Sequence, residues 1–392
     1  MANEMSRRDV VKTGLAAAAL GAAGSFEWVL PALAQGEVMV PFTDSHVSPP
    51  FNPNPAPDRR LLDTRQIAGA YTPKDQFFTT QHYGHPEIDP AAYRLKVSGL
   101  VSTNLALSID ELRKMGNTEL IAGFECSGNR RPVQGLVGNG RWTGVPLKTV
   151  LDKAGLKADA QEIVFFGADR GKESVVFRAT PPMEVEQQYG RSLPRARALA
   201  ADPAPFLAYA LNGEPLTKHQ GAPLRLIVPG WYGAPNVKWL SEIVVQNEPY
   251  MGKFQTHWYR TLKGEMINGE LKWVETGITH LNLKSFVARV TRNGSDHKIT
   301  VIALSDGTPL KSVEVQIDGG AWAPATVDPS TTAKYGWKLY HLTVKNLAAG
   351  EHTLVSRATD VNGKVQPTEK ELENKKTFLE DNSQHPRKVM IG

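Results

Sequence analysis

The sequence contains a single cysteine, Cys126, among 392 residues, and this one thiol excludes several architectures at once. It allows no internal disulfide, no zinc site built from paired cysteines, no iron–sulfur cluster and no Cys-x-x-Cys-His haem attachment. Any redox chemistry of the chain must therefore use another kind of group.

The composition is that of an ordinary globular protein, with 41% hydrophobic and 22% charged residues. It excludes a disordered, a collagen-like and a multi-span membrane protein. Forty-five Lys and Arg against 40 Asp and Glu leave a formal net charge of +5, spread along the chain. This small excess is weak support for an anionic ligand, and no basic run favours nucleic acid.

The first 34 residues have the pattern of a twin-arginine export signal. Paired arginines in Ser6–Lys12 precede a segment rich in Ala, Gly and Leu from Thr13 to Leu30, and Ala32–Ala34 forms an A-x-A cleavage site. A membrane anchor is the alternative, but three glycines weaken the apolar segment. We therefore expect a periplasmic protein that is free of the membrane after cleavage near Gln35. Because this route exports folded chains, it also favours a bound cofactor.

Two domains are expected after the signal. Residues 35–60 are rich in Pro and Asn and predict an extended arm. Residues 61–262 alternate short apolar runs with helical pieces, including a capping box that starts at Ser108 and a helix over 146–154. This pattern is typical of a mixed α+β domain.

The last part of the chain has a different rhythm. After a stretch that resembles a linker, residues 266–279, short β-rich runs alternate with turn pairs such as Asn293-Gly294, Asp306-Gly307 and Asn362-Gly363. Residues 280–392 are therefore predicted to form an immunoglobulin-like sandwich. The predicted fold class is α+β, a mixed domain followed by an all-β sandwich.

Cys126 follows an apolar run, Leu120–Phe124, at a place where a strand should end and a site can be built. Paired arginines, Arg130 and Arg131, come soon after it. Nearby arginines favour the thiolate, which is both the nucleophilic form of cysteine and its metal-binding form. A buried, inert cysteine is the alternative.

The segment Cys126–Arg131 resembles the metal-ligand motif C-[AS]-G-N-R-R of the sulfite oxidase family of molybdenum enzymes. Further motifs of that family follow in the same order, so the resemblance extends from about Tyr71 to the C-terminus. These motifs are Gly140–Leu147, Gly167–Asp169, Leu207–Gly213, Pro223–Arg225, Val228–Gly230, Val237–Leu240 and Val365–Pro367.

The resemblance implies molybdenum bound to a pyranopterin (molybdopterin) in the first domain, followed by an immunoglobulin-like dimerisation domain that would make a homodimer. It also implies oxidation of sulfite, or a related sulfur oxyanion, to sulfate by oxo transfer. Because the chain has no haem-attachment motif, we expect no haem in it and a separate electron acceptor, such as a periplasmic cytochrome c.

By resemblance, Cys126 is the protein ligand of the metal, Arg131 binds the substrate anion and Tyr259 lies near the metal. The alternatives are a surface position or a pterin-phosphate contact for Arg131, and packing between the domains for Tyr259. Tyr209 also belongs to a family motif, but we expect it in the core.

The expected pterin contacts come from the first loop, residues 77–82, and from the later motifs. Arg225 and Lys238 have an independent rationale, because a buried cation would neutralise the phosphate of the cofactor. The full set is Phe78, Thr79, Gln81, His82, Asp169, Arg225, Asn236, Val237 and Lys238.

One departure leaves the substrate open. Thr80 stands where the family has its main substrate arginine, so a positive charge is missing. Oxygen transfer on another sulfur species, such as reduction of a sulfoxide, is the alternative within the enzyme class. A non-enzymatic exported binding module, with Cys126 as an unused thiol, is the alternative from another class.

Overall fold

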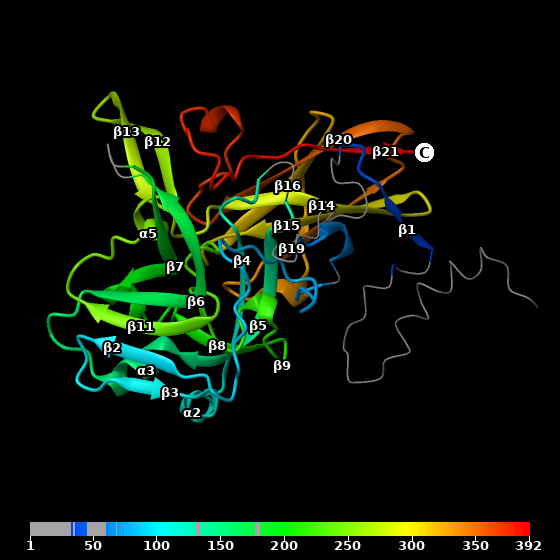
Figure 1. Ribbon diagram of the computed structural model, residues 1–392. Coiled ribbons are helices and arrows are strands. Elements are labelled where there is room, and N and C mark those ends of the chain that lie inside the picture. Colours follow the sequence, from blue (N-terminus) through cyan, green and yellow to red (C-terminus); the bar gives the residue numbers. More distant parts are fainter. Residues whose placement is uncertain (1–32, 34–35, 45–59, 68, 131–133, 177–180) are drawn as a thin grey trace, which may run out of the picture.

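The structure is a computed structural model that describes residues 33, 36–44, 60–67, 69–130, 134–176 and 181–392 (Figure 1). The predicted export signal, apart from Leu33, lies outside the described residues. None of the described helices is long and apolar enough to cross a membrane.

Two five-stranded sheets form the first part of the fold (Figure 1). In the first sheet, with strand order β3-β2-β11-β6-β7, only β2 and β11 pair in parallel. The second, β10-β8-β5-β4 with β9 beside β8, is antiparallel throughout. Their strands are β2 (Leu95–Gly99), β3 (Leu105–Leu107), β4 (Thr118–Glu125), β5 (Val137–Pro146), β6 (Glu162–Val175), β7 (Met183–Pro194), β8 (Phe206–Leu211), β9 (Glu214–Pro215), β10 (Arg225–Ile227) and β11 (Leu240–Gln246).

Helices are short in the described part of the chain. They are α2 (Ile109–Met115), α3 (Leu147–Ala154), α4 (Arg195–Ala198) and α5 (Lys253–Thr256), with 3₁₀ turns at Thr64–Gln66, Lys218–Gln220, Pro329–Thr331 and Lys370–Leu372. The predicted capping box is present, because Ser108 accepts from the Glu111 amide and Glu111 accepts from the Ser108 amide. α3 ends, as predicted, at Gly155, whose φ of +70° favours glycine.

The linker expected over 266–279 is wrong. Strands β12 (Arg260–Ile267) and β13 (Glu270–Gly277) pair along their whole length as a hairpin. Asn268 and Gly269 make the two-residue turn, both with positive φ (+54° and +82°). Figure 1 shows the hairpin standing out from the sheets, at the upper left.

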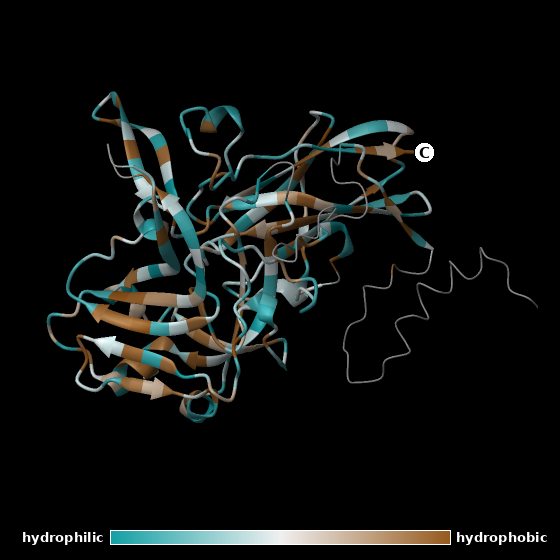
Figure 2. Ribbon diagram, viewed as in Figure 1, coloured by the Kyte–Doolittle hydropathy of each residue, from teal (hydrophilic) through white to brown (hydrophobic). Residues whose placement is uncertain are grey.

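Two further sheets make the sandwich, with strand orders β1-β14-β15-β19-β18 and β17-β16-β20-β21. Their inner faces enclose an apolar core, and Figure 2 shows hydrophobic residues gathered on these strands. The strands are β1 (Glu37–Val40), β14 (Lys284–Asn293), β15 (Asp296–Leu304), β16 (Leu310–Ile317), β17 (Ala323–Pro324), β18 (Thr326–Val327), β19 (Lys338–Lys345), β20 (Gly350–Asp360) and β21 (Arg387–Ile391). The described part of the predicted arm thus adds a strand, β1, to the edge of this sandwich.

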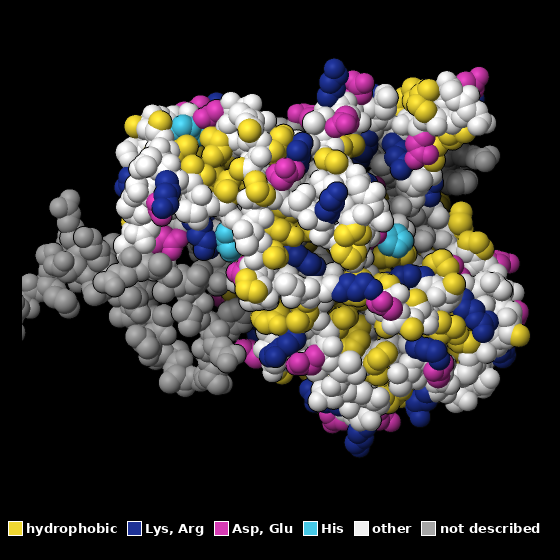
Figure 3. All heavy atoms as spheres, turned by 180° about the vertical axis from the view of Figure 1, so that it is seen from behind, with side chains coloured by type: hydrophobic (Ala, Val, Ile, Leu, Met, Phe, Trp, Pro, Cys, Tyr) yellow, Lys and Arg dark blue, Asp and Glu magenta, His cyan; other side chains and the backbone are white. Residues whose placement is uncertain are grey.

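The predicted fold class is confirmed, and the first domain is mostly β. The predicted boundaries 61–262 and 280–392, and dimerisation by the sandwich, stay predictions. Shared cores join the two parts: Trp142 and Phe124 pack in one cluster with Tyr335, and Val137 packs in another with Trp337. Figure 3 shows basic and acidic side chains interspersed over the described residues of one face, in keeping with the charge pattern of the sequence.

Candidate active site

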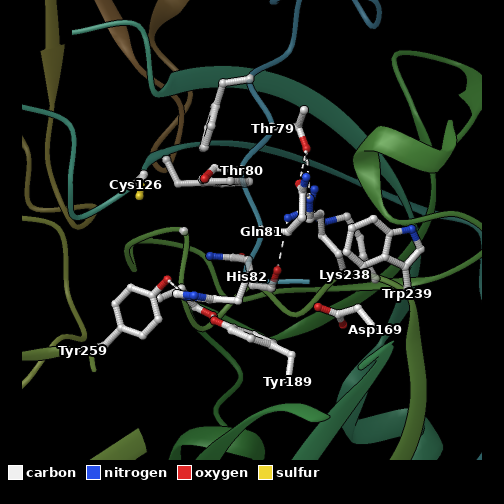
Figure 4. A pocket seen from close by; sticks show the side chains of 16 residues that line it. Thr79, Thr80, Gln81, His82, Cys126, Asp169, Tyr189, Lys238, Trp239 and Tyr259 are labelled. Atoms are coloured by element: carbon white, nitrogen blue, oxygen red, sulfur yellow. Dashed lines mark hydrogen bonds between the residues drawn. The ribbon is translucent and has the colours of Figure 1, made fainter. Parts of the chain in front are cut away.

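A pocket opens where the first loop, the end of β4, the bulge of β6 and the segment before β11 meet (Figure 4). It encloses about 740 Å³ of empty space, open solvent included, a size typical of cofactor sites. It is lined by Phe78, Thr79, Thr80, Gln81, His82, Phe124, Cys126, Asp169, Tyr189, Arg225, Gly233, Ala234, Asn236, Lys238, Trp239 and Tyr259.

Cys126 is half-buried and directly follows β4. Its amide donates to Leu136 O (2.9 Å), its carbonyl accepts from the Asn129 amide (2.8 Å), and the Gly128 amide lies 3.5 Å from its Sγ. An amide hydrogen aimed at sulfur favours the thiolate. The loop thus holds the sulfur in a defined place on the pocket wall.

Tyr259, His82 and Tyr189 form a hydrogen-bonded row near Cys126 (Figure 4). His82 Nε2 lies 2.8 Å from the Tyr259 hydroxyl, and the Tyr189 hydroxyl donates to Ala234 O (2.7 Å). Burial raises the pKa of both tyrosines, and a side-chain hydrogen bond joins their hydroxyls. The Tyr189 hydrogen is already donated to Ala234, so Tyr189 is the acceptor in this bond. Tyr259 therefore donates to Tyr189, which leaves it to accept from His82.

The histidine of this row is neutral at pH 7. Burial, and then the charge of Lys253, lower the pKa of His82 from 6.5 to about 4. Burial raises the pKa of Tyr259 well above its usual 10. Both groups are thus held in forms that keep a proton to share without carrying charge.

Lys238 forms hydrogen bonds with polar groups of the first loop, on the opposite side of the pocket view in Figure 4. Its Nζ donates to Thr79 Oγ1 (2.9 Å) and Gln81 Oε1 (3.0 Å). The Thr79 hydroxyl in turn donates to His219 O (3.0 Å). This part of the pocket presents a fixed positive charge surrounded by hydroxyl and amide groups.

Arg225, on β10, is a second cation, and only 4% of it is exposed. It donates to Gln220 O (3.0 Å) and Asn236 O (3.2 Å), and its guanidinium lies over the rings of Phe124 and Trp142. Burial lowers its pKa from 12.5 to about 9. Its Nε has no hydrogen-bond partner in the described part of the chain, so the site has unused capacity for an anion.

Asp169 supplies an acceptor on the same pocket. It lies in the irregular part of β6, between Phe166 and Arg170, where the pairing with β7 is interrupted. Burial raises its pKa from 3.8 to about 6, and its Oδ1 is without a hydrogen-bond partner among the described residues. A buried carboxyl in this state is suited to an NH-rich ligand.

The structure brings almost all of the predicted site residues to this pocket. Arg131 lies outside the described residues, and the Val237 side chain is in the core, fully buried, instead of on the pocket wall. Tyr209 packs in that same core, as predicted. Sequence reasoning missed Tyr189, which lies between motifs on a strand and carries no local signal of its role.

The chemistry of these side chains fits a molybdenum pyranopterin. No cluster of three or more His, Cys, Asp or Glu that could hold a metal occurs among the described residues, so a metal bound by Cys126 needs other ligands. A dithiolene would supply them. The unpartnered Arg225 Nε and Asp169 Oδ1, with Lys238, match the phosphate and ring nitrogens of such a cofactor.

Comparison with known proteins agrees with this chemistry. Residues 82–254 match the family described as the oxidoreductase molybdopterin binding domain. Sulfite oxidase of Gallus gallus is 31% identical over 343 residues, which cover 81% of this chain and 71% of that protein. Mitochondrial sulfite oxidase of Homo sapiens is 31% identical over 351 residues, and the chain spans only 60% of its length.

A solved structure shares the fold. The sulfane dehydrogenase SoxCD of Paracoccus pantotrophus superposes with a TM-score of 0.72 at 24% identity, covering 94% of this chain and 96% of that one. At that identity the likeness shows the fold alone. With the molybdopterin-binding match and the coverage of the Gallus gallus enzyme, the chain belongs to the sulfite oxidase family of molybdopterin oxidoreductases.

Proposed function

We propose that this chain oxidises sulfite, or a related sulfur oxyanion, to sulfate and passes the electrons to a separate acceptor such as a periplasmic cytochrome c. The observation that supports this function most directly is the position of Cys126 on the wall of the pocket that also presents the Tyr259–His82 pair. A soft metal ligand and a proton-sharing pair then serve the same small space.

The bound cofactor supplies two-electron redox chemistry and oxygen-atom transfer. In the loaded enzyme Cys126 would hold the metal, and Arg225, Lys238 and Asp169, which line the same pocket, would hold the pterin and its phosphate. Arg225 and Lys238 need not release a proton for this role. They act through their positive charge and through hydrogen bonds.

Tyr259 orients the substrate and donates a hydrogen bond to it from its hydroxyl. Its hydroxyl already donates to Tyr189 and accepts from His82, so an oxyanion that arrives beside it can take over the donated hydrogen bond. Neutral His82 then holds the phenol in place from the other side. Phe254 and Trp258 pack against the His82 ring and hold it in place.

The cellular setting follows from the first residues and is part of the proposal. Export by the twin-arginine route would place the loaded enzyme in the periplasm, where small cytochromes accept electrons. A homodimer formed by the sandwich is likewise proposed.

Metal analysis with a turnover assay tests the function. Purified protein should contain molybdenum and should reduce cytochrome c or ferricyanide when sulfite is added. Cys126→Ser should abolish this reduction, whereas Ser127→Ala should keep it, because the Ser127 hydroxyl has no hydrogen-bond partner among the described residues. Loaded protein that is inactive with sulfite would contradict the proposal.

A second candidate is oxygen transfer on an uncharged sulfur compound, such as reduction of a sulfoxide. Thr80 favours it, because this pocket residue is neutral where the family has an arginine. Assays of dimethyl sulfoxide reduction with a reduced dye, alongside the sulfite assay on the same preparation, separate the two candidates.

A further inference from the structure

Arg191, on β7, is a buried cation that the sequence motifs do not predict. Only 2% of it is exposed, and it donates to two carbonyl oxygens, Phe254 O (2.6 Å) and Ile278 O (3.1 Å). Its Nε has no hydrogen-bond partner and no carboxylate pairs with it, both within the described residues. Burying a guanidinium without a counter-charge costs free energy of folding. A buried arginine of this kind therefore points to a functional role for its charge.

The position of Arg191 points to the pocket. Its guanidinium carbon lies 5.6 Å from the centre of the Tyr259 ring, on the side of the pocket wall made by Tyr259 and Tyr189. Its partner Ile278 is also bonded to this tyrosine, because the Ile278 amide donates to Tyr259 O (2.9 Å). Arg191 therefore both braces the segment that carries Tyr259 and places a positive charge behind its ring.

The pocket has no positive charge at Thr80, and Arg191 can supply one nearby. Thr80 lines the pocket with a neutral hydroxyl, and the other pocket cations, Arg225 and Lys238, are the ones suited to the cofactor. A sulfur oxyanion beside Tyr259 would then lie one aromatic ring away from the positive charge of Arg191. In a dry site, a charge one aromatic ring away still acts strongly.

We propose that Arg191 is a positioning residue for anion binding, and that its buried charge, acting from behind Tyr259, takes the place of the arginine absent at Thr80. The idea rests on the proposed function, since it names what lets this pocket accept an oxyanion. It predicts that anion affinity depends on the charge at position 191.

Calorimetric titration of the molybdenum-loaded protein with sulfate and with nitrate tests this dependence. Arg191→Met should weaken sulfate binding about tenfold or more. The loss for nitrate should be about the square root of that for sulfate, because a charge effect scales with ligand charge. Arg191→Lys, which keeps the charge, should stay within about threefold of the unchanged protein. Arg170→Met, which removes an exposed arginine from the neighbouring strand, is the control for net charge.

A second charge tests the same idea from the other side of the pocket. Thr80→Arg added to Arg191→Met should restore most of the sulfate affinity. In turnover, Arg191→Met alone should raise KM for sulfite more than it lowers kcat. Arg191→Gln, a neutral side chain that still donates a hydrogen bond, serves if Arg191→Met does not fold.

Three results would overturn the idea: unchanged sulfate binding in the neutral variants, equal losses for sulfate and nitrate, or no rescue by Thr80→Arg. Each of them would leave Arg191 as a structural brace. These binding outcomes do not depend on turnover, so an enzyme that binds anions through Arg191 but does not oxidise sulfite would contradict the proposed function alone.

Discussion

Lys284 of the sandwich forms a buried ion pair with Glu125, the residue before Cys126. Its Nζ lies 2.9 Å from Glu125 Oε2, and the two side chains are 4% and 1% exposed. The same Nζ donates to Asn129 O (2.7 Å), while Asn129 Nδ2 donates to Glu125 (2.7 Å). Burial raises the pKa of Glu125, and Lys284 acts against this rise. The C-terminal sandwich thus ties down the loop that carries the predicted metal ligand.

Removing the lysine should destabilise the protein strongly. Lys284→Met leaves Glu125 buried without its counter-charge, which should cost about 3 to 5 kcal/mol in the free energy of unfolding. Urea denaturation measures this loss. Lys148→Met breaks an exposed pair and should cost about 0.5 kcal/mol or less. Adding Glu125→Gln to Lys284→Met should recover part of the stability; no recovery would mean that the charge is not the cause.

Loss of the Tyr259 hydroxyl should affect turnover more than folding. Tyr259→Phe keeps the ring but removes both hydrogen bonds of the hydroxyl, so kcat should fall about a hundredfold. Steady-state kinetics and the thermal midpoint measure the two effects. Tyr209→Phe is the matched control, because this tyrosine packs in the core away from the pocket and should leave kcat near that of the unchanged enzyme. Equal losses in both variants would contradict the role of Tyr259.

Arg225 should matter for the cofactor more than for the fold. Arg225→Met removes a buried charge that no described carboxylate balances, and it should cost about 2 to 5 kcal/mol of cofactor binding. Molybdenum and pterin content per chain measure this loss. Arg113→Met, which removes an exposed arginine from α2, should leave the content unchanged. Full loading of the Arg225 variant would show that its charge does not hold the cofactor.

Two pocket residues should shift stability in opposite directions as the pH falls. The unfolded chain protonates His82 near pH 6.5 and the folded chain only near 4, so His82 destabilises the fold as the pH falls through this window. Asp169, with its pKa raised from 3.8 to about 6, takes up its proton first in the folded chain and stabilises it below pH 6. Each effect is at most about 3 kcal/mol.

Variants separate the two effects. Between pH 6.5 and 4, His82→Gln should lose stability less steeply than the unchanged protein, and Asp169→Asn more steeply. Urea denaturation at several pH values gives these slopes. Parallel slopes in all three proteins would show that neither group has the shifted pKa.

Local features were readable from the sequence because their causes are local. The Ser108 capping box and the glycine end of α3 depend on residues within one or two turns. The pocket residues are instead predicted by motifs spread from Phe78 to Tyr259, which the fold brings together. The hairpin at Asn268-Gly269 carries a clear turn signal, and its two strands replace the linker that the sequence analysis predicts there.

By itself, the sequence determined the fold class, the family motifs and the cysteine at the centre of the site. Only the tertiary structure decided that β1 of the arm joins β14, that Lys284 meets Glu125 across 159 positions, and that Arg191 lies behind Tyr259. Such contacts depend on sheet register and on the packing of distant segments. A local pattern specifies neither, because the same alternating strand can pair with several partners until the cores close.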